Sequence, residues 1–321
     1  MLKERNQSID ILKFLAVLLI VNSHMDPLYG KFSPLATGGT IGDVLFVFIS
    51  GFTLFLGTRR GFDNFYKRRI NRIYPTVFGW AVIGCLFFDS KSNLLNVILF
   101  GGGDFVAFIM ISYVIIYFIA KYCLQWLKYL LAAYTLVCIG VYFTFDKSAD
   151  FNMYGNIYKW FCFFAFMVQG AMVGYYSKNN NRKQQMMKDL IKLVGCIVGF
   201  FALYAFKKYP SYNFIQTLSM IPLFGVTYYA YCLFHSSIAN VLQGKPKIWL
   251  AIRFVGGLCL EVYLVNLVII HLPYPIGFPF SALAAVIIII AIAYMLRCLS
   301  RIWSQTFKDT DYQWKEVFKL L

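Results

Sequence analysis

Long runs of hydrophobic residues alternate with short polar segments along the whole chain. The runs are about 17–22 residues long, the length of helix that crosses the roughly 30 Å hydrocarbon core of a bilayer. Because lipid offers no hydrogen-bond partners to the backbone, each run is predicted to be a helix. The pattern therefore predicts an all-α polytopic membrane protein with about ten transmembrane helices. The predicted spans are 9–25, 40–57, 73–88, 104–120, 129–145, 159–176, 190–206, 214–234, 250–270 and 278–297.

The composition agrees with this pattern and excludes a soluble domain. Of the 321 residues, 60% are hydrophobic and 14% are charged. The net charge of +16 does not indicate nucleic-acid binding, because most of the 30 lysine and arginine residues lie in alternate connecting segments. Membrane proteins concentrate basic residues in their cytoplasmic loops. We therefore predict that both termini are cytoplasmic.

The domain organisation is simple, since the sequence contains no internal repeat and no separate soluble region. Residues 1–301 are interpreted as one membrane domain. Residues 302–321 mix aromatic and charged side chains and are predicted to form a cytoplasmic amphipathic tail along the inner membrane surface. Residues 89–103 include an apolar piece too short to span, which would be interfacial or re-entrant.

The eight cysteines are scattered singly along the chain, without metal-ligand spacing or a plausible disulfide framework. We therefore expect neither a metal site nor a tightly bound cofactor. A cleaved signal peptide is also not expected, because Asp10 and Lys13 interrupt the first apolar run and no small-residue cleavage site follows it.

Lys13 and His24 are the polar residues that stand out in the first predicted span. On a helix, eleven residues at about 100° each amount to ~1100°, roughly 20° past three turns, with a rise of ~16 Å. The two side chains therefore lie on one stripe. A cation and an imidazole on a membrane helix are costly unless they face protein or water. In the alternative interpretation, Lys13 extends to the interface and His24 simply ends the helix.

The second predicted span carries Asp43 near its outer end and a Ser50-Gly51 pair at mid-membrane. A carboxylate near His24 would orient the imidazole and fix its tautomer, and both residues lie toward the outer side in the predicted topology. Gly51 permits close approach of the backbone to a neighbouring helix or ligand. Ser50 either lines a site or bonds to the backbone of its own helix.

The inner segment 58–72 holds six cations and one acid and is predicted to be a loop. If it were locally helical, Arg69 and Arg72 would share a face. Arginine binds phosphate oxygens in a bidentate manner, which suits a nucleotide-bearing donor at the cytoplasmic side. The alternative is purely topological, because cytoplasmic loops carry cations without any ligand.

The ninth predicted span contains Arg253, Glu261, Tyr263 and Asn266. A buried carboxylate in lipid has to be paired, neutral or in a wet cavity. Glu261 and Asn266 are five residues apart, about 140° around a helix, so they do not share a face, whereas Tyr263 and Asn266 do. The alternative for these side chains is hydrogen bonding between helices. His235 and His271 fall at span ends and are interpreted as interfacial.

Four short motifs follow one another along the chain and carry a resemblance to a known family. They comprise Arg5, Ile9, Asp10, Lys13 and His24; Phe46, Phe48, Ser50, Gly51 and Phe52; Arg69, Arg72 and Pro75; and the stretch CLEVYLVN from Cys259 to Asn266. With these motifs the chain resembles the acyltransferase-3 family, bacterial membrane proteins that acylate extracytoplasmic sugars. The chain departs from the family pattern in having Cys259 for a serine, Asn266 for a late histidine, and its acid one place earlier before Ser50-Gly51.

The resemblance implies a multi-pass enzyme of the bacterial cytoplasmic membrane. Its donor would be acyl-CoA, most simply acetyl-CoA as a co-substrate, and its acceptor a hydroxyl of a cell-surface polysaccharide or of its polyprenyl-linked precursor. O-acetylation in polysaccharide biosynthesis is the expected activity. The sequence names neither the acyl group nor the sugar, and it leaves the oligomeric state open.

The predicted site combines these residues in one mechanism. His24 is the general base or a transiently acylated relay, Asp43 orients it, and Lys13 stabilises negative charge. Arg69 and Arg72 bind the donor phosphates. The candidate cavity-lining residues are Arg5, Asp10, Ser50, Glu261, Tyr263 and Asn266. A transporter or flippase for an anionic or sugar substrate is the rival interpretation, which predicts discontinuous helices and an internal repeat.

Overall fold

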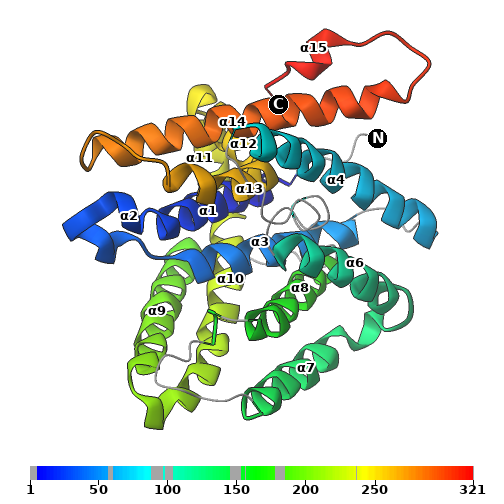
Figure 1. The fold of residues 1–321 in the computed structure, drawn as a ribbon. Coiled ribbons are helices and arrows are strands. Elements are labelled where there is room, and N and C mark those ends of the chain that lie inside the picture. The colour runs from blue at the N-terminus through cyan, green and yellow to red at the C-terminus, as the bar shows by residue number, and fades with distance from the viewer. Residues whose placement is uncertain are drawn as a thin grey trace. The chain divides into compact units, whose positions relative to one another are not determined.

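The computed structural model describes residues 6–56, 61–87, 97, 104–144, 153–155, 157–177, 185–235 and 237–320. Within these ranges the protein is helical and contains no strand (Figure 1). In chain order the elements are α1 Gln7–His24, α2 Asp26–Tyr29, η1 Gly30–Leu35, α3 Gly39–Leu56, α4 Phe62–Phe87, α6 Asp104–Tyr122, η2 Leu124–Trp126, α7 Leu127–Tyr142, α8 Tyr158–Tyr176, α9 Met186–Tyr204, η3 Ala205–Lys208, η4 Pro210–Ser219, α10 Met220–Phe234, α11 Ser237–Gln243, α12 Pro246–Gly257, α13 Cys259–Ile270, α14 Phe280–Thr306 and α15 Trp314–Val317.

All ten predicted spans fall on helical segments, which confirms the all-α fold class. Length and apolar composition mark six of the described segments as candidate membrane spans, or eight if each of two bent pairs is one span. The predicted spans 73–88 and 159–176 lie on α4 and α8, which are outside this set. α8 buries most of its side chains among other helices, so it needs less apolar surface toward lipid. The six are Gln7–His24, Asp104–Tyr122, Leu124–Tyr142, Met186–Lys208, Ser211–Phe234 and Phe280–Thr306.

From Phe62 on, the basic segment 58–72 is helical and not the loop that its charge predicts. α4 begins at Phe62 and carries Arg69 and Arg72 on its N-terminal half. The rings of Phe62 and Tyr66 stack one turn apart at 5.6 Å, a spacing that supports a helix. A positive-inside segment needs only to reach the cytoplasm, and no residue of 62–74 prevents helix formation. The predicted loop 89–103 lies outside the described residues except for Val97.

The ninth predicted span, 250–270, is broken rather than continuous. α12 ends at Gly257 and α13 begins at Cys259, with a bend of 74° between them. Two consecutive glycines, Gly256 and Gly257, end α12, and glycine is a poor helix former. A second bend, of 100°, separates the segment Asp26–Leu35 from Gly39–Leu54.

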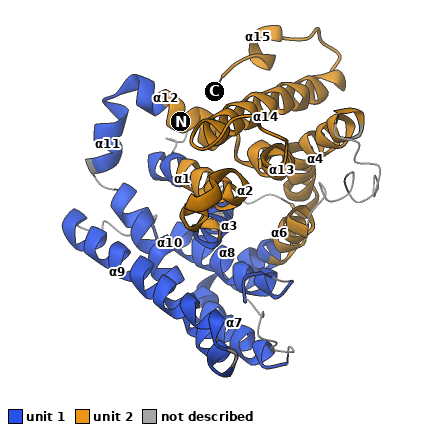
Figure 2. Ribbon diagram, turned by 60° about the vertical axis from the view of Figure 1, so that its left-hand side comes forward, with its two compact units in different colours: residues 1–13, 40–58, 116–249 blue, residues 14–39, 59–115, 250–321 orange. Residues whose placement is uncertain are grey.

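The chain divides into two compact units, each assembled from three stretches of sequence (Figure 2). Unit 1 comprises residues 1–13, 40–58 and 116–249, and unit 2 comprises residues 14–39, 59–115 and 250–321. The unit boundaries fall inside α1, α6 and α12 and after the first residue of α3, Gly39, so each of these helices contributes residues to both units.

In unit 1, α3 and α8 approach each other at their glycines. A Cβ atom added to Gly51 would lie 2.0 Å from the carbonyl oxygen of Met167, and one added to Gly170 would lie 1.9 Å from that of Phe48. Gly174, one turn after Gly170, meets the backbone of Phe52. Such backbone contact between membrane helices requires small residues at the interface. The prediction that Gly51 allows close approach of a neighbouring helix is confirmed.

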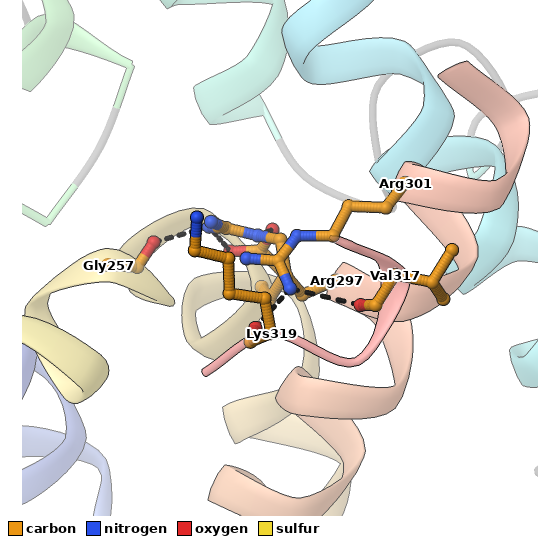
Figure 3. A network of polar contacts seen from close by, with 6 residues as sticks. Gly257, Arg297, Arg301, Val317 and Lys319 are labelled. Carbon is orange, nitrogen blue, oxygen red and sulfur yellow. Dashed lines mark hydrogen bonds and ion pairs between the residues drawn. The ribbon is translucent and has the colours of Figure 1, made fainter. Parts of the chain in front are cut away.

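In unit 2, α14 packs against α4, α13, α2 and α15. Phe78 of α4 contacts Trp303, with ring centroids 5.5 Å apart. The residues after α14 fold back on it: Tyr294 donates a hydrogen bond to the carbonyl of Phe318 at 2.6 Å, and Arg301 donates to the carbonyls of Val317 and Lys319 (Figure 3). Val317 is fully buried. Helix α14 continues to Thr306, beyond the predicted start of the tail at residue 302.

Candidate functional site

Helix α1 is continuous from Gln7 to His24, which is the condition for the predicted stripe of Lys13 and His24. Both side chains are half-buried, and Asp10, one turn before Lys13, is buried. Lys13 belongs to unit 1 and His24 to unit 2. Arg5 lies outside the described residues. Whether the stripe faces water stays a prediction.

The segment that follows His24 is held against α1 by Asn22, a residue that the sequence analysis did not single out. The amide Nδ2 of Asn22 donates hydrogen bonds to the carbonyls of Leu35 and Thr37, both at 2.9 Å. Its Oδ1 accepts a hydrogen bond from the hydroxyl of Tyr29 at 2.7 Å. The three polar groups that these bonds involve, one hydroxyl and two carbonyls, therefore all bind one side chain, two residues before His24. No sequence motif marks Asn22, because its partners are two backbone carbonyls and one tyrosine hydroxyl of a segment without a regular pattern.

Two consecutive glycines bring the end of this segment close to α1. Gly38 has φ +98°, and a Cβ there would lie 2.8 Å from a methyl group of Leu19. Gly39 lies so close to Ser23 that a Cβ would approach its hydroxyl to 2.6 Å. Glycine satisfies both the left-handed backbone and the contact with α1.

The segments that follow α1 and α13 meet in unit 2. The ring of Phe278 contacts Tyr29 and Phe32, at 5.0 and 5.2 Å between centroids. The hydroxyl of Ser281 donates a hydrogen bond to the carbonyl of Leu28 at 3.3 Å. These contacts join the two segments that continue the His24 end of α1 and the Asn266-bearing helix α13.

Arg69 and Arg72 share helix α4 but differ in their surroundings. The Arg69 guanidinium lies over the rings of Phe65 and Tyr113, at 5.2 and 5.4 Å from their centroids. Its Nε is buried and has no hydrogen-bond partner in the described part of the chain. Arg72 is exposed. The Arg69 guanidinium therefore lies between aromatic rings with its Nε–H unpaired among the described residues, whereas the Arg72 side chain is on the surface of the protein.

Glu261 is buried and fully paired. Its carboxylate accepts hydrogen bonds from Nε and Nη2 of Arg297, at 2.6 and 2.8 Å, and Nη2 also binds the carbonyl of Gly257 (Figure 3). Arg297 thus joins α14 to the last residue of α12 and the first turn of α13. This ion pair agrees with the alternative interpretation of Glu261, in which its carboxylate forms hydrogen bonds between helices. The sequence analysis missed Arg297, although a basic residue ending the last apolar run is a natural partner for a buried acid.

Asn266 contrasts with Glu261 on the same helix. It is 1% exposed, and its Oδ1 has no hydrogen-bond partner among the described residues. Tyr263, one turn earlier, contacts Phe105 of α6, with ring centroids 4.4 Å apart. Arg253 of α12 also has a buried Nε without a partner in the described ranges.

Asp43 and Ser50 lie on α3 in unit 1 and are half-buried. The predicted pairing of Asp43 with His24 joins residues of different units and stays a prediction. The two remaining histidines contact other polar groups: Nδ1 of His235 lies 3.2 Å from the hydroxyl of Ser8, and Nδ1 of exposed His271 lies 2.7 Å from the carbonyl of Leu267.

Taken together, the apolar helices and the polar groups buried among them define a multi-pass α-helical membrane protein. The comparison with known families then identifies it more closely: the acyltransferase-3 family, described as an acyltransferase domain, matches residues 6–298. The chain belongs to this family. No curated protein and no solved structure matched the chain significantly.

Proposed function

We propose that this protein is an O-acyltransferase of the bacterial cytoplasmic membrane. It moves an acyl group, in the simplest case acetyl, from cytoplasmic acyl-CoA to a hydroxyl of a cell-surface polysaccharide or its lipid-linked precursor. The observation that carries the proposal is the match to an acyltransferase family over residues 6–298, a range that includes the proposed catalytic and donor-binding residues.

The proposed chemistry begins at His24. Its imidazole takes the proton of the acceptor hydroxyl while that oxygen attacks the thioester carbonyl. The C–S bond then breaks, the acyl group becomes an ester, and the coenzyme A thiolate leaves and receives the proton. In the relay version, His24 attacks first and carries the acyl group before the hydroxyl takes it. Lys13 stabilises negative charge on the donor or the tetrahedral oxyanion, and Asp43 orients the imidazole.

Arg69 and Arg72 bind the phosphates of the donor in this proposal. The Nε of Arg69 supports it, because a buried guanidinium donor without a hydrogen-bond partner among the described residues is suited to an anionic oxygen. Exposed Arg72 is available for the outermost phosphate. The acyl end of the donor then extends from the arginines toward His24.

The experiment uses the full chain in lipid nanodiscs with radiolabelled acetyl-CoA and a membrane glycan fraction. His24→Ala should abolish transfer, while the variant unfolds at the temperature of the wild type. His271→Ala is the matched control, since His271 is exposed at a helix end, and it should keep full activity. Full transfer by His24→Ala would remove the base assignment. Absence of transfer by the wild type, together with flux of a sugar or anion into proteoliposomes, would favour the transporter.

A further inference from the structure

Unit 2 contains buried polar atoms that have no hydrogen-bond partner in the part of the chain that the structure describes. Among the described residues they are Arg69 Nε, Thr76 Oγ1, Arg253 Nε and Asn266 Oδ1. Buried polar groups in folded proteins nearly always have hydrogen-bond partners, so each exception needs an explanation. Thr76 and Asn266 are both only 1% exposed. Their contrast with the paired Glu261 indicates that the helices of unit 2 satisfy some polar groups and leave others for a ligand.

Arg69 and Thr76 lie on one stripe of α4. Seven residues turn a helix by ~700°, about 20° short of two turns, and rise by about 10 Å. Phe78, which contacts α14, is about 200° further round the helix from Thr76, so this stripe is not the one centred on α14. The stripe is buried, because Ile73 between the two residues is 5% exposed.

Asn266 also lies away from α14. Glu261 contacts Arg297 of α14, and Asn266 is about 140° round α13 from Glu261. Helix α13 packs against α4. Helix α6 adjoins both, through Tyr113 at Arg69 and through Phe105 at Tyr263. Thr76 and Asn266 therefore lie on two helices of unit 2 that pack against each other, at positions turned away from Phe78 and Glu261, which contact α14.

We propose that Thr76 and Asn266 bind the pantetheine arm of the acyl-CoA donor. This inference rests on the proposed function and extends its donor site from Arg69 inward. The Thr76 hydroxyl donates a hydrogen bond to an amide carbonyl of the arm, and Asn266 Oδ1 accepts one from an amide N–H. Each of the two atoms thereby gains the hydrogen-bond partner that it lacks among the described residues of the protein.

The surroundings favour the donor arm over a sugar. The neighbouring buried side chains are apolar: Ile73 and Val77 on α4, and Val262 and Val265 on α13. A pantetheine arm is largely aliphatic with two amide groups, so it needs few polar partners. A sugar carries hydroxyl groups on most of its carbons and would leave many of them without partners among these side chains.

Isosteric substitutions separate a ligand site from a structural one. Thr76→Val and Asn266→Leu keep the volume and remove the orphaned atoms. Because no protein hydrogen bond is lost, the ligand-free variants should unfold at or above the temperature of the wild type. Thr227→Val is the matched control in unit 1. Thr227 is also fully buried, but its hydroxyl donates to Gln169 Oε1 at 2.7 Å, so this variant should unfold earlier and keep its affinity for the donor.

Binding is measured on the full chain in nanodiscs with two probes, coenzyme A and adenosine 3′,5′-bisphosphate, which lacks the arm. Thr76→Val and Asn266→Leu should each weaken coenzyme A binding about tenfold and leave the bisphosphate unaffected. Arg69→Ala should weaken both probes. Thr76→Ser, which restores the hydroxyl, should recover most of the coenzyme A affinity.

The outcomes distinguish a failure of the arm site from a failure of the proposed function. If the wild type binds neither probe, the proposed function is wrong. If the wild type binds coenzyme A and both isosteric variants bind it equally well, the arm site is wrong and the donor assignment stands. Equal weakening of both probes, or early unfolding of the ligand-free isosteres, would also overturn the arm site.

Discussion

The carboxylate of Glu261 and the guanidinium of Arg297 form a bidentate pair, with N–O distances of 2.6 and 2.8 Å. The same guanidinium binds the carbonyl of Gly257, where α12 ends. A broken membrane helix exposes carbonyl groups that lipid cannot satisfy. Arg297 therefore provides both a counter-charge and a hydrogen-bond donor at the bend between α12 and α13.

Arg297→Ala should destabilise the folded protein by about 3 kcal/mol, because it leaves a buried carboxylate without its partner. Arg297→Lys should recover only part of this loss, since an ammonium lacks the planar fork that reaches both Glu261 and Gly257. Thermal unfolding in detergent measures both. The double variant Glu261→Leu/Arg297→Leu should lose less than Arg297→Ala alone. An unchanged melting temperature in Arg297→Ala would show that the bend is stable without the pair.

Replacing Asn22 should loosen the segment that follows His24. Asn22→Ala removes three hydrogen bonds, and at about 1 kcal/mol for each the loss is about 3 kcal/mol of local stability. Hydrogen exchange over residues 26–38 should accelerate while exchange in α8 stays unchanged. We expect transfer activity to fall as well.

Tyr29→Phe is the graded control for Asn22. It removes only the bond to Oδ1 and leaves both backbone carbonyls bound, so its exchange rates should lie between those of the wild type and Asn22→Ala. Equal exchange in all three proteins would mean that Gly38, Gly39 and the ring contacts of Phe278 are sufficient to hold the segment.

Gly170→Ala should prevent the contact between α3 and α8. The new methyl group would lie 1.9 Å from a backbone oxygen, a distance that no rotation of a side chain relieves. We expect a large loss of folded protein, measured by size-exclusion chromatography after extraction. Gly140→Ala on α7 is the control, because nothing lies within 4 Å of its Cβ position. Normal yield of Gly170→Ala would contradict the direct backbone contact.

Arg69 and Arg72 should contribute unequally to donor binding. Arg69→Ala should raise the KM for acyl-CoA about tenfold or more, and Arg72→Ala should raise it by less. Arg72 is exposed, so an ion pair between its guanidinium and a donor phosphate would be screened by salt. The acceptor KM should stay within about twofold in both. Steady-state kinetics at low and high salt checks this. Equal effects on donor and acceptor would support the topological interpretation of the basic segment.

The positions of the helices could be predicted because the thickness of the bilayer fixes the length of each apolar run. The helical conformation at the start of α4 could not be predicted in this way. Basic residues indicate on which side of the membrane a segment lies, but they do not determine whether its backbone is helical. The break at Leu258 was also not predicted, because a glycine pair is compatible with a continuous membrane helix. It is stabilised by Arg297, which is distant in sequence.

The geometry of the candidate site could also be predicted only in part. Periodicity predicts the common stripe of Lys13 and His24 and the separate faces of Glu261 and Asn266, since both depend on helix geometry alone. Periodicity does not reveal that Glu261 has a partner while Asn266 Oδ1 has none among the residues that the structure describes. It also does not reveal Asn22, whose three partners lie in a segment without a regular pattern.

The division of the chain between the two units has a consequence for biosynthesis. The residues around His24 complete their unit only with residues 250–321, which are synthesised after the other two stretches of that unit. Phe278 and Ser281, which contact the segment after His24, are among these late residues. A nascent chain that contains only the residues before 250 therefore still lacks the third stretch of the unit that contains the proposed base, and we expect it to be inactive in acyl transfer.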